Sequence, residues 1–222
     1  MTSLLRRYSA IAATVLLAVT PQISSAQTWA SWTSMNAGNV FGTLGSNTVT
    51  YTGTFNSYEN SNTGFNYWIP SGAYSQNSVV PPSNAGLIRF VSAGRGSIVF
   101  GAPVLDPYIA FNSVGQPGLP VTYDFLTSPF TVVSNNNAGG AYWGPGSYTT
   151  SGNTLTGREF SGVAKFSGTY SQIDFTFDAE NWHGITVGVG STNVVPEPST
   201  YALMAAGLAG LFAVARRRRQ AR

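Results

Sequence analysis

The segment ENWHG, residues 180–184, places four side chains that could take part in binding or catalysis next to one another. It holds the one histidine, His183, directly after Glu180, Asn181 and Trp182. An indole ring can stack on the C–H face of a sugar while a neighbouring amide or carboxylate binds its hydroxyl groups. These four residues are therefore our candidate ligand-binding site. The structural alternative is that Trp182 plugs one end of the fold and His183 is an exposed turn residue.

Signals for catalysis are weaker than those for binding. Cleavage of a glycosidic bond needs two carboxylates about 5–9.5 Å apart. Asp124, Glu159 and Glu180 could supply them, although a sequence does not give their separation. A serine–histidine–acid triad would have to use His183, but the chain has no G-x-S-x-G motif to place a nucleophile. We therefore expect a non-catalytic protein and assign no catalytic residue.

No pattern in this sequence indicates thiol or metal chemistry. The chain has no cysteine, which excludes thiol catalysis, disulfide bonds and cysteine-ligated metal sites. A single histidine leaves mainly oxygen ligands, and Asp174, Asp178 and Glu180 do not have the spacing of a calcium-binding loop. We expect no metal and no cofactor.

The elements that must position these residues are β-strands. Thr48–Phe55 alternates strictly, with Val49, Tyr51 and Phe55 on one face and threonines on the other. Such alternation is typical of half-buried antiparallel strands. Alternation of this kind, or a short apolar run bounded by turn residues, occurs in nine further segments: Leu87–Val91, Ser97–Phe100, Tyr108–Phe111, Val121–Phe125, Phe130–Val133, Thr154–Arg158, Val163–Phe166, Ser171–Asp178 and Gly184–Gly190.

The spacing of these strands predicts the fold class. No segment after residue 26 has a convincing helical period, and residues 56–64, 77–86 and 135–146 are predicted loops. About ten closely spaced strands are typical of an all-β fold. We expect an antiparallel, jelly-roll-like β-sandwich over residues 27–193, with a barrel as the second choice.

The charged residues are distributed unevenly along the chain. The net charge is +3, but seven of the eleven basic residues lie at the two ends. Four basic and seven acidic residues lie between residues 27 and 195, so the body has a net charge of −3. Because the basic residues form no patch on the body, we exclude nucleic acid as a partner.

Residues 1–26 have the three parts of a secretory signal peptide. Arg6 and Arg7 make a positive start, residues 8–20 form an apolar run, and Ser24-Ser25-Ala26 places small residues before a cleavage site. We predict Sec export and cleavage by signal peptidase after Ala26. An uncleaved anchor helix is the alternative, but this run is shorter than the ~20 residues needed to span a bilayer.

The C-terminal residues 194–222 show a second ordered pattern. Pro196 and Pro198 hold Glu197 in extended backbone. Thr200–Ala215 carries no charge and would make a helix about 24 Å long, slightly short of the ~30 Å hydrocarbon core. A membrane stop-transfer signal that favours a cytoplasmic C-terminus follows, made of four consecutive arginines: Arg216, Arg217, Arg218 and Arg219.

In this order, the three parts of the tail resemble the PEP-CTERM sorting signal of Gram-negative bacteria. The resemblance covers VPEPST at 195–200, the apolar segment 201–215 and the arginines 216–219. It implies transient insertion in the inner membrane and cleavage near Pro-Glu-Pro by an exosortase, an integral membrane, transpeptidase-like cysteine enzyme. Release to the cell surface or the exopolysaccharide matrix would follow. Glu197 would be a recognition element, because the nucleophile belongs to the exosortase.

The body adds a resemblance without an activity. Residues 106–189 are similar to a β-domain that recurs among PEP-CTERM proteins and has no assigned activity. We therefore expect an exported surface or matrix protein whose body could bind exopolysaccharide. Two alternatives stay open, namely a secreted glycan hydrolase or lyase and a periplasmic domain that remains tethered to the membrane.

Overall fold

The described part of the chain is built almost entirely from β-strands. The computed structural model describes residues 27–60, 65–83, 85–137 and 142–190. Within these ranges the helical elements are two short 3-10 turns, η1 (Ser71–Ala73) and η2 (Gln76–Ser78). Neither turn has the length or the apolar character that a membrane crossing requires. The predicted signal peptide and the predicted membrane helix at 201–215 lie outside the described residues.

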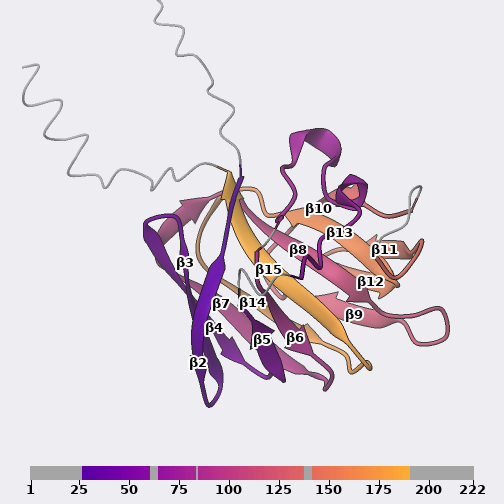
Figure 1. Cartoon of the computed structure of the whole chain (residues 1–222), viewed down its shortest axis with the longest axis horizontal. Coiled ribbons are helices and arrows are strands. Elements are labelled where there is room, and N and C mark those ends of the chain that lie inside the picture. Colours follow the sequence, from indigo (N-terminus) through magenta and orange to yellow (C-terminus); the bar gives the residue numbers. More distant parts are fainter. Residues whose placement is uncertain (1–26, 61–64, 84, 138–141, 191–222) are drawn as a thin grey trace, which may run out of the picture.

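The strands form two antiparallel sheets. The first, named here the β15 sheet, has the order β10-β13-β8-β15-β6-β5, and β1 also pairs with β15. Figure 1 shows β10, β13, β8 and β15 side by side in this order. Its strands are β1 (Gln27–Trp29), β5 (Ser57–Glu59), β6 (Leu87–Phe90), β8 (Pro107–Val114), β10 (Thr131–Asn135), β13 (Phe160–Lys165) and β15 (His183–Gly190).

The second sheet, named the β7 sheet, has the order β11-β12-β9-β14-β7-β4-β3-β2. Each sheet ends in edge strands, β10 and β5 in one and β11 and β2 in the other, so neither closes on itself. Its strands are β2 (Ser31–Asn36), β3 (Asn39–Leu44), β4 (Asn47–Gly53), β7 (Gly94–Leu105), β9 (Val121–Asp124), β11 (Ser147–Ser151), β12 (Thr154–Arg158) and β14 (Thr169–Phe177).

One aromatic-rich core joins the two sheets. Phe111 of β8 meets Tyr123 of β9 with ring centroids 5.3 Å apart, and Phe90 of β6 meets Phe177 of β14 at 4.6 Å. Tyr51 on β4 is also fully buried in this core. On β4 the inward residues Val49 and Tyr51 are the ones that the period-two pattern placed on a single face, because alternate side chains of a strand point to the same side.

Strand β15 departs from the half-buried pattern, because both of its faces are covered. Seven of its eight residues are buried. Its outer face packs against Leu87 and Trp29, members of a second hydrophobic cluster that also includes Trp68 and Tyr74 from the long connection between β5 and β6. Gly184 and Gly188 permit this close covering, since a Cβ there would come within 2.8 Å of the Leu87 side chain and 2.6 Å of the Trp29 ring.

The expectation of an all-β, antiparallel fold is confirmed, with several corrections to its elements. Each sheet is open, so the barrel alternative is wrong for the described residues. Three strands between residues 27 and 44 were not predicted, nor was β11. Strand β5 lies inside the predicted loop 56–64, because residues 57–59 pair with β6 through the backbone without an alternating apolar pattern.

Candidate functional site

Glu180 is a buried carboxylate in the short link between β14 and β15. It is 7% exposed, and its Oε2 accepts a hydrogen bond from the Gly115 backbone N–H at 2.7 Å. The same oxygen lies 3.3 Å from Nδ1 of His183. A buried carboxylate is costly unless hydrogen bonds or opposite charge compensate it. Glu180 therefore acts first as a structural link between the end of β8 and the start of β15.

His183 is fully buried, so the structural alternative in which it is an exposed turn residue is wrong. It begins β15 and pairs with Phe90 in the register with β6. Its imidazole stacks on the Phe90 ring at 5.3 Å and meets the ring of Tyr123 edge-on at 5.7 Å. The strand begins one residue earlier than the pattern indicated, and this difference moves the histidine from a loop into the core.

The second carboxylate, Glu159, lies close to Glu180. It accepts a hydrogen bond from Ser113 Oγ, while Glu180 accepts one from Gly115, two residues further along the chain. Burial raises the pKa of Glu159, and the negative charge of Glu180 raises it further, against the opposing effect of the Ser113 hydrogen bond. The fold therefore gathers both carboxylates at the end of β8.

Asp124, the third acid that sequence reasoning considered, is not part of this pair. Its Oδ1 accepts a hydrogen bond from the Leu126 backbone N–H at 2.9 Å. Within the described ranges, no group of three or more histidine, cysteine or acidic side chains could hold a metal ion.

Trp182 belongs to an aromatic cluster from three separate segments. The name aromatic cluster is used here for five residues: Phe65, Tyr67, Tyr142, Trp143 and Trp182. Trp182 stacks on Tyr67 at 5.7 Å and contacts Trp143 at 5.9 Å. Three further ring contacts complete the cluster, with centroid distances of 4.8 Å for Trp143–Tyr142, 5.6 Å for Tyr142–Phe65 and 4.6 Å for Phe65–Tyr67.

Buried asparagines hold two segments of this cluster. Asn112 of β8 donates a hydrogen bond from Nδ2 to the carbonyl oxygen of Tyr67. Asn136 donates to the carbonyl oxygens of Gly144, at 3.1 Å, and Glu159, at 2.9 Å. The second asparagine therefore ties the loop that carries Tyr142 and Trp143 to the backbone of the half-buried carboxylate Glu159.

Sequence reasoning found only part of this arrangement. Of the four predicted ligand-binding residues, Asn181 is exposed and Trp182 is partly exposed, whereas Glu180 and His183 are buried. Phe65, Tyr67 and Tyr142 were missed. The available signal was the gathering of aromatic residues inside polar, glycine-rich loops, in FNYW at 65–68 and AYW at 141–143.

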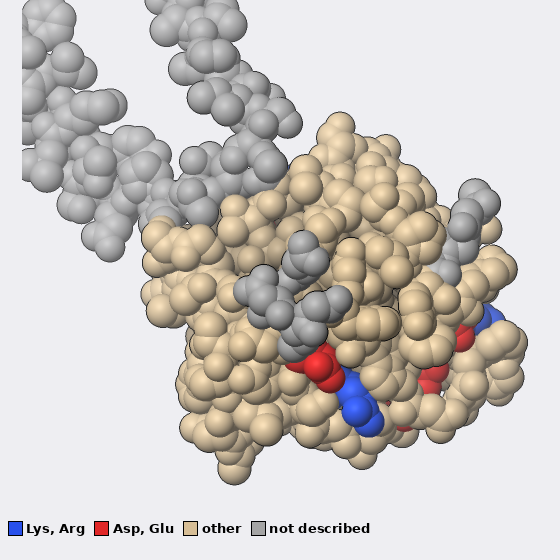
Figure 2. All heavy atoms as spheres, in the orientation of Figure 1, with Lys and Arg blue, Asp and Glu red and all other residues tan. Residues whose placement is uncertain are grey.

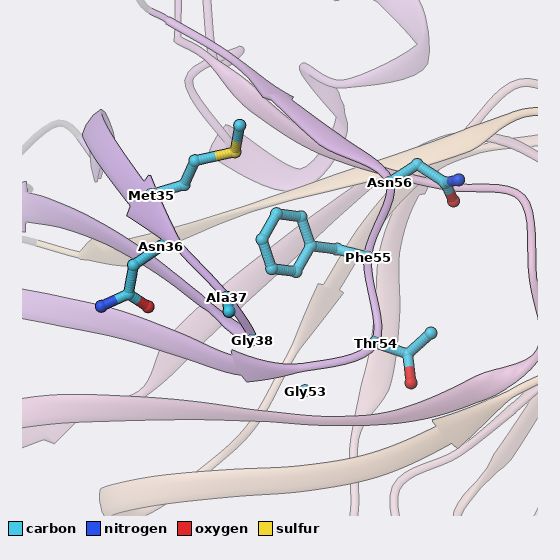
Figure 3. Close-up of a pocket in the computed structure, with 8 residues that line it drawn as sticks. All are labelled: Met35, Asn36, Ala37, Gly38, Gly53, Thr54, Phe55 and Asn56. Atoms are coloured by element: carbon cyan, nitrogen blue, oxygen red, sulfur yellow. The ribbon is translucent and has the colours of Figure 1, made fainter.

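A separate recess of about 530 Å³ lies between the β2–β3 turn and the connection from β4 to β5. In Figure 3 the Phe55 ring extends toward Met35 and Ala37 across this recess. All eight lining residues are uncharged. The amide oxygens of Asn36 and Asn56 already accept hydrogen bonds from Asn39 and the Val91 backbone. The recess therefore adds no acid–base group to the site.

Comparison with known proteins decides the nature of the tail. Residues 194–219 match the family model of the PEP-CTERM protein-sorting motif. The chain carries a PEP-CTERM sorting motif. No curated protein and no solved structure matches the chain.

The matched range contains every residue that was predicted to act in sorting. The Pro-Glu-Pro residues within it are Pro196, Glu197 and Pro198. The predicted stop-transfer residues within it are Arg216, Arg217, Arg218 and Arg219. All seven lie outside the described residues, as does Ala26 at the predicted signal cleavage site. The motif is therefore assigned from the sequence match, and the stop-transfer role of the arginines stays a prediction.

Proposed function

We propose that this protein is a non-catalytic component of the cell surface or the exopolysaccharide matrix, exported and then processed at its PEP-CTERM tail. The single observation that carries the proposal is the match of residues 194–219 to the sorting motif. The motif implies export to the cell envelope and processing by an exosortase. The proposed route begins with Sec export and signal peptidase cleavage after Ala26.

The tail chemistry explains how processing would be directed. The apolar segment 201–215 pauses in the inner membrane while Arg216–Arg219 stay on the cytoplasmic side. Pro196 and Pro198 keep the backbone around Glu197 extended. The exosortase thus receives an unfolded substrate strand, with one acidic side chain at a set height above the bilayer, and cleaves near it.

A test of processing compares the wild type with Glu197→Ala in cells that encode an exosortase. We expect the extracellular wild-type protein to lack Arg216–Arg219 by intact mass, and Glu197→Ala to remain full-length in the membrane fraction. Ser191→Ala, which precedes the matched range 194–219, is the control and should be processed. An extracellular wild-type protein that retains Arg222, or normal processing of Glu197→Ala, would contradict the proposal.

The proposed activity of the body is binding of polysaccharide, and the proposed architecture is a jelly-roll-like sandwich. Support comes from the two sheets that share one core and from an aromatic cluster beside polar loops. Stacking of aromatic rings on sugar rings needs no catalytic group. This activity suits a protein that is released among envelope polysaccharides.

A glycan hydrolase or lyase is the second candidate, favoured by the closeness of Glu159 and Glu180. A raised pKa suits Glu159 to the role of general acid. Glu180, however, is buried and already bound to Gly115, which leaves it poorly placed to reach a substrate. Release of reducing ends from exopolysaccharide by the wild type, lost in Glu159→Gln, would favour the enzyme over the binding protein.

A further inference from the structure

The tryptophans of the described chain divide into two classes by the hydrogen bonding of their indole N–H groups. A tryptophan packed inside a protein usually finds an acceptor for this group. No acceptor within the described residues bonds the indole N–H of Trp143 or Trp182. The other three are all bonded: Trp29 to Val80 O at 2.9 Å, Trp32 to Thr186 Oγ1 at 3.2 Å and Trp68 to Ala85 O at 2.9 Å.

Both unbonded indoles belong to the aromatic cluster, and the cluster is open to solvent. Trp143 is 51% exposed, and Phe65 and Tyr142 are each 46% exposed. Three large aromatic side chains exposed together are unusual on a protein surface unless they contact something. The cluster therefore offers apolar ring faces together with indole N–H groups that no described residue accepts a hydrogen bond from.

We propose that the aromatic cluster is the binding site for an uncharged polysaccharide chain. This assignment rests on the proposed function, in which the body binds polysaccharide, and it names the site and the ligand class. Trp143 and Trp182 stack against the C–H faces of pyranose rings, and their N–H groups donate to sugar oxygens. Asn181, exposed beside Trp182, supplies a further amide for sugar hydroxyls.

The charges around the cluster favour a neutral sugar over an acidic one. Glu59 and Arg89 both act on Tyr67, with opposite signs, so they offer little net charge there. Glu159 lies beside the loop of Trp143 without a basic partner among the described residues. A uronic acid polymer would meet this negative charge. Much of the molecular face in Figure 2 is likewise neither acidic nor basic.

The site is held in place before a ligand arrives. Asn112 fixes the backbone at Tyr67, and Asn136 fixes the loop that carries Trp143. Trp182 directly precedes His183, which is locked in the core. Groups that are already ordered lose less conformational entropy on binding. The geometry therefore suits recognition of an extended chain by several rings at once.

The test is a tryptophan fluorescence titration of the processed protein, purified from the culture medium of its host. The probes are cellohexaose, laminarihexaose and mannohexaose as neutral chains and polygalacturonate as the acidic chain. We expect at least one neutral chain to bind, and Trp143→Ala to weaken that binding roughly threefold to tenfold. The matched control is Met35→Ala, a distant residue that is 54% exposed, which should bind like the wild type.

Three outcomes would overturn the assignment. These are binding of none of the neutral chains, equal affinities of Trp143→Ala and the wild type, or preference for polygalacturonate. Self-association by sedimentation that Trp143→Ala abolishes, without any sugar binding, would make the cluster a contact between copies instead. The mass of the secreted Trp143→Ala protein separates the proposed sugar site from the proposed sorting. A protein whose mass shows that the tail was cleaved, but whose binding of sugar does not respond as expected, rejects the site and leaves sorting intact.

Discussion

At the level of single side chains, two carboxylates respond to their surroundings in opposite directions. The pKa of Glu159 is raised, chiefly by burial. The pKa of Asp106 is lowered, because the Gly168 backbone N–H and the Lys165 ammonium outweigh a burial effect that acts the other way. The Lys165 nitrogen lies 2.9 Å from Asp106 Oδ2. These two acids therefore contribute pH dependences of opposite sign to folding stability.

We predict that Glu159→Gln and Asp106→Asn change the pH profile of stability in opposite senses. A raised folded-state pKa contributes stability that is present below the ordinary value of 4.5 and is lost as the pH rises. The stability of Glu159→Gln relative to the wild type should therefore increase as the pH rises above that value. A lowered pKa contributes stability that is lost as the pH falls through 3.8 and below. Asp106→Asn should therefore approach the wild type on acidification.

Urea unfolding midpoints across this pH range would measure both differences. Parallel curves for the wild type and both variants would show that neither carboxylate changes its proton affinity on folding. The comparison needs no absolute stability, because each variant is read against the wild type at the same pH.

At the level of elements, the long connection between β5 and β6 acts as a cover for the β15 sheet. Trp68 and Tyr74 within it are fully buried and contact each other edge-on at 5.4 Å. Beneath them lie Ala110 of β8 and Val163 of β13, on the outer face of the sheet. In Figure 1 the two 3-10 turns of this connection lie beside β10, in agreement with their contacts.

We predict that Trp68→Ala destabilises the fold by about 3–5 kcal/mol, the usual cost of emptying a large buried aromatic site. It also leaves the carbonyl of Ala85 without its indole donor. Trp143→Ala, at a half-exposed position, should change stability by less than about 0.5 kcal/mol. Urea denaturation followed by circular dichroism compares the two, and equal losses would mean that the aromatic cluster is part of the core.

At the level of the whole molecule, the described chain begins and ends on paired strands. Gln27 of β1 lies opposite Gly190 of β15. The PEP-CTERM motif begins four residues after Gly190. His183 lies at the other end of β15, roughly 23 Å away at ~3.3 Å per residue. The aromatic cluster is therefore connected to the end of β15 that is remote from the sorting tail.

The whole fold depends little on ionic attraction. Among the described residues, one ion pair joins a lysine to a carboxylate, Lys165–Asp106, and each of its side chains is about one-third exposed. Pairs of this kind contribute about 0–1 kcal/mol. We predict that raising the sodium chloride concentration from low to high changes the free energy of unfolding by less than about 1 kcal/mol. A larger shift in the urea midpoint would reveal long-range charge effects that these contacts do not explain.

Local sequence patterns were enough to predict the sorting tail and most of the strands. The order of Pro-Glu-Pro, apolar segment and arginines is contiguous, so no folding is needed to recognise it. Val49 and Tyr51, or Ile173 and Phe175, are buried as their alternation predicts, because side-chain direction follows from strand geometry alone. Strand β11 escaped notice since its residues are mostly exposed and carry no apolar alternation.

Only tertiary packing could decide which residues share a site. Tyr67, Trp143 and Trp182 are far apart in the chain. They meet because the connection between β5 and β6, the loop between β10 and β11 and the residues just before β15 converge. The same packing buried His183, brought Glu159 beside Glu180 and left Asp124 apart. Local sequence carries the direction of each side chain along its own strand. The meeting of distant loops depends on sheet order, which no short segment contains.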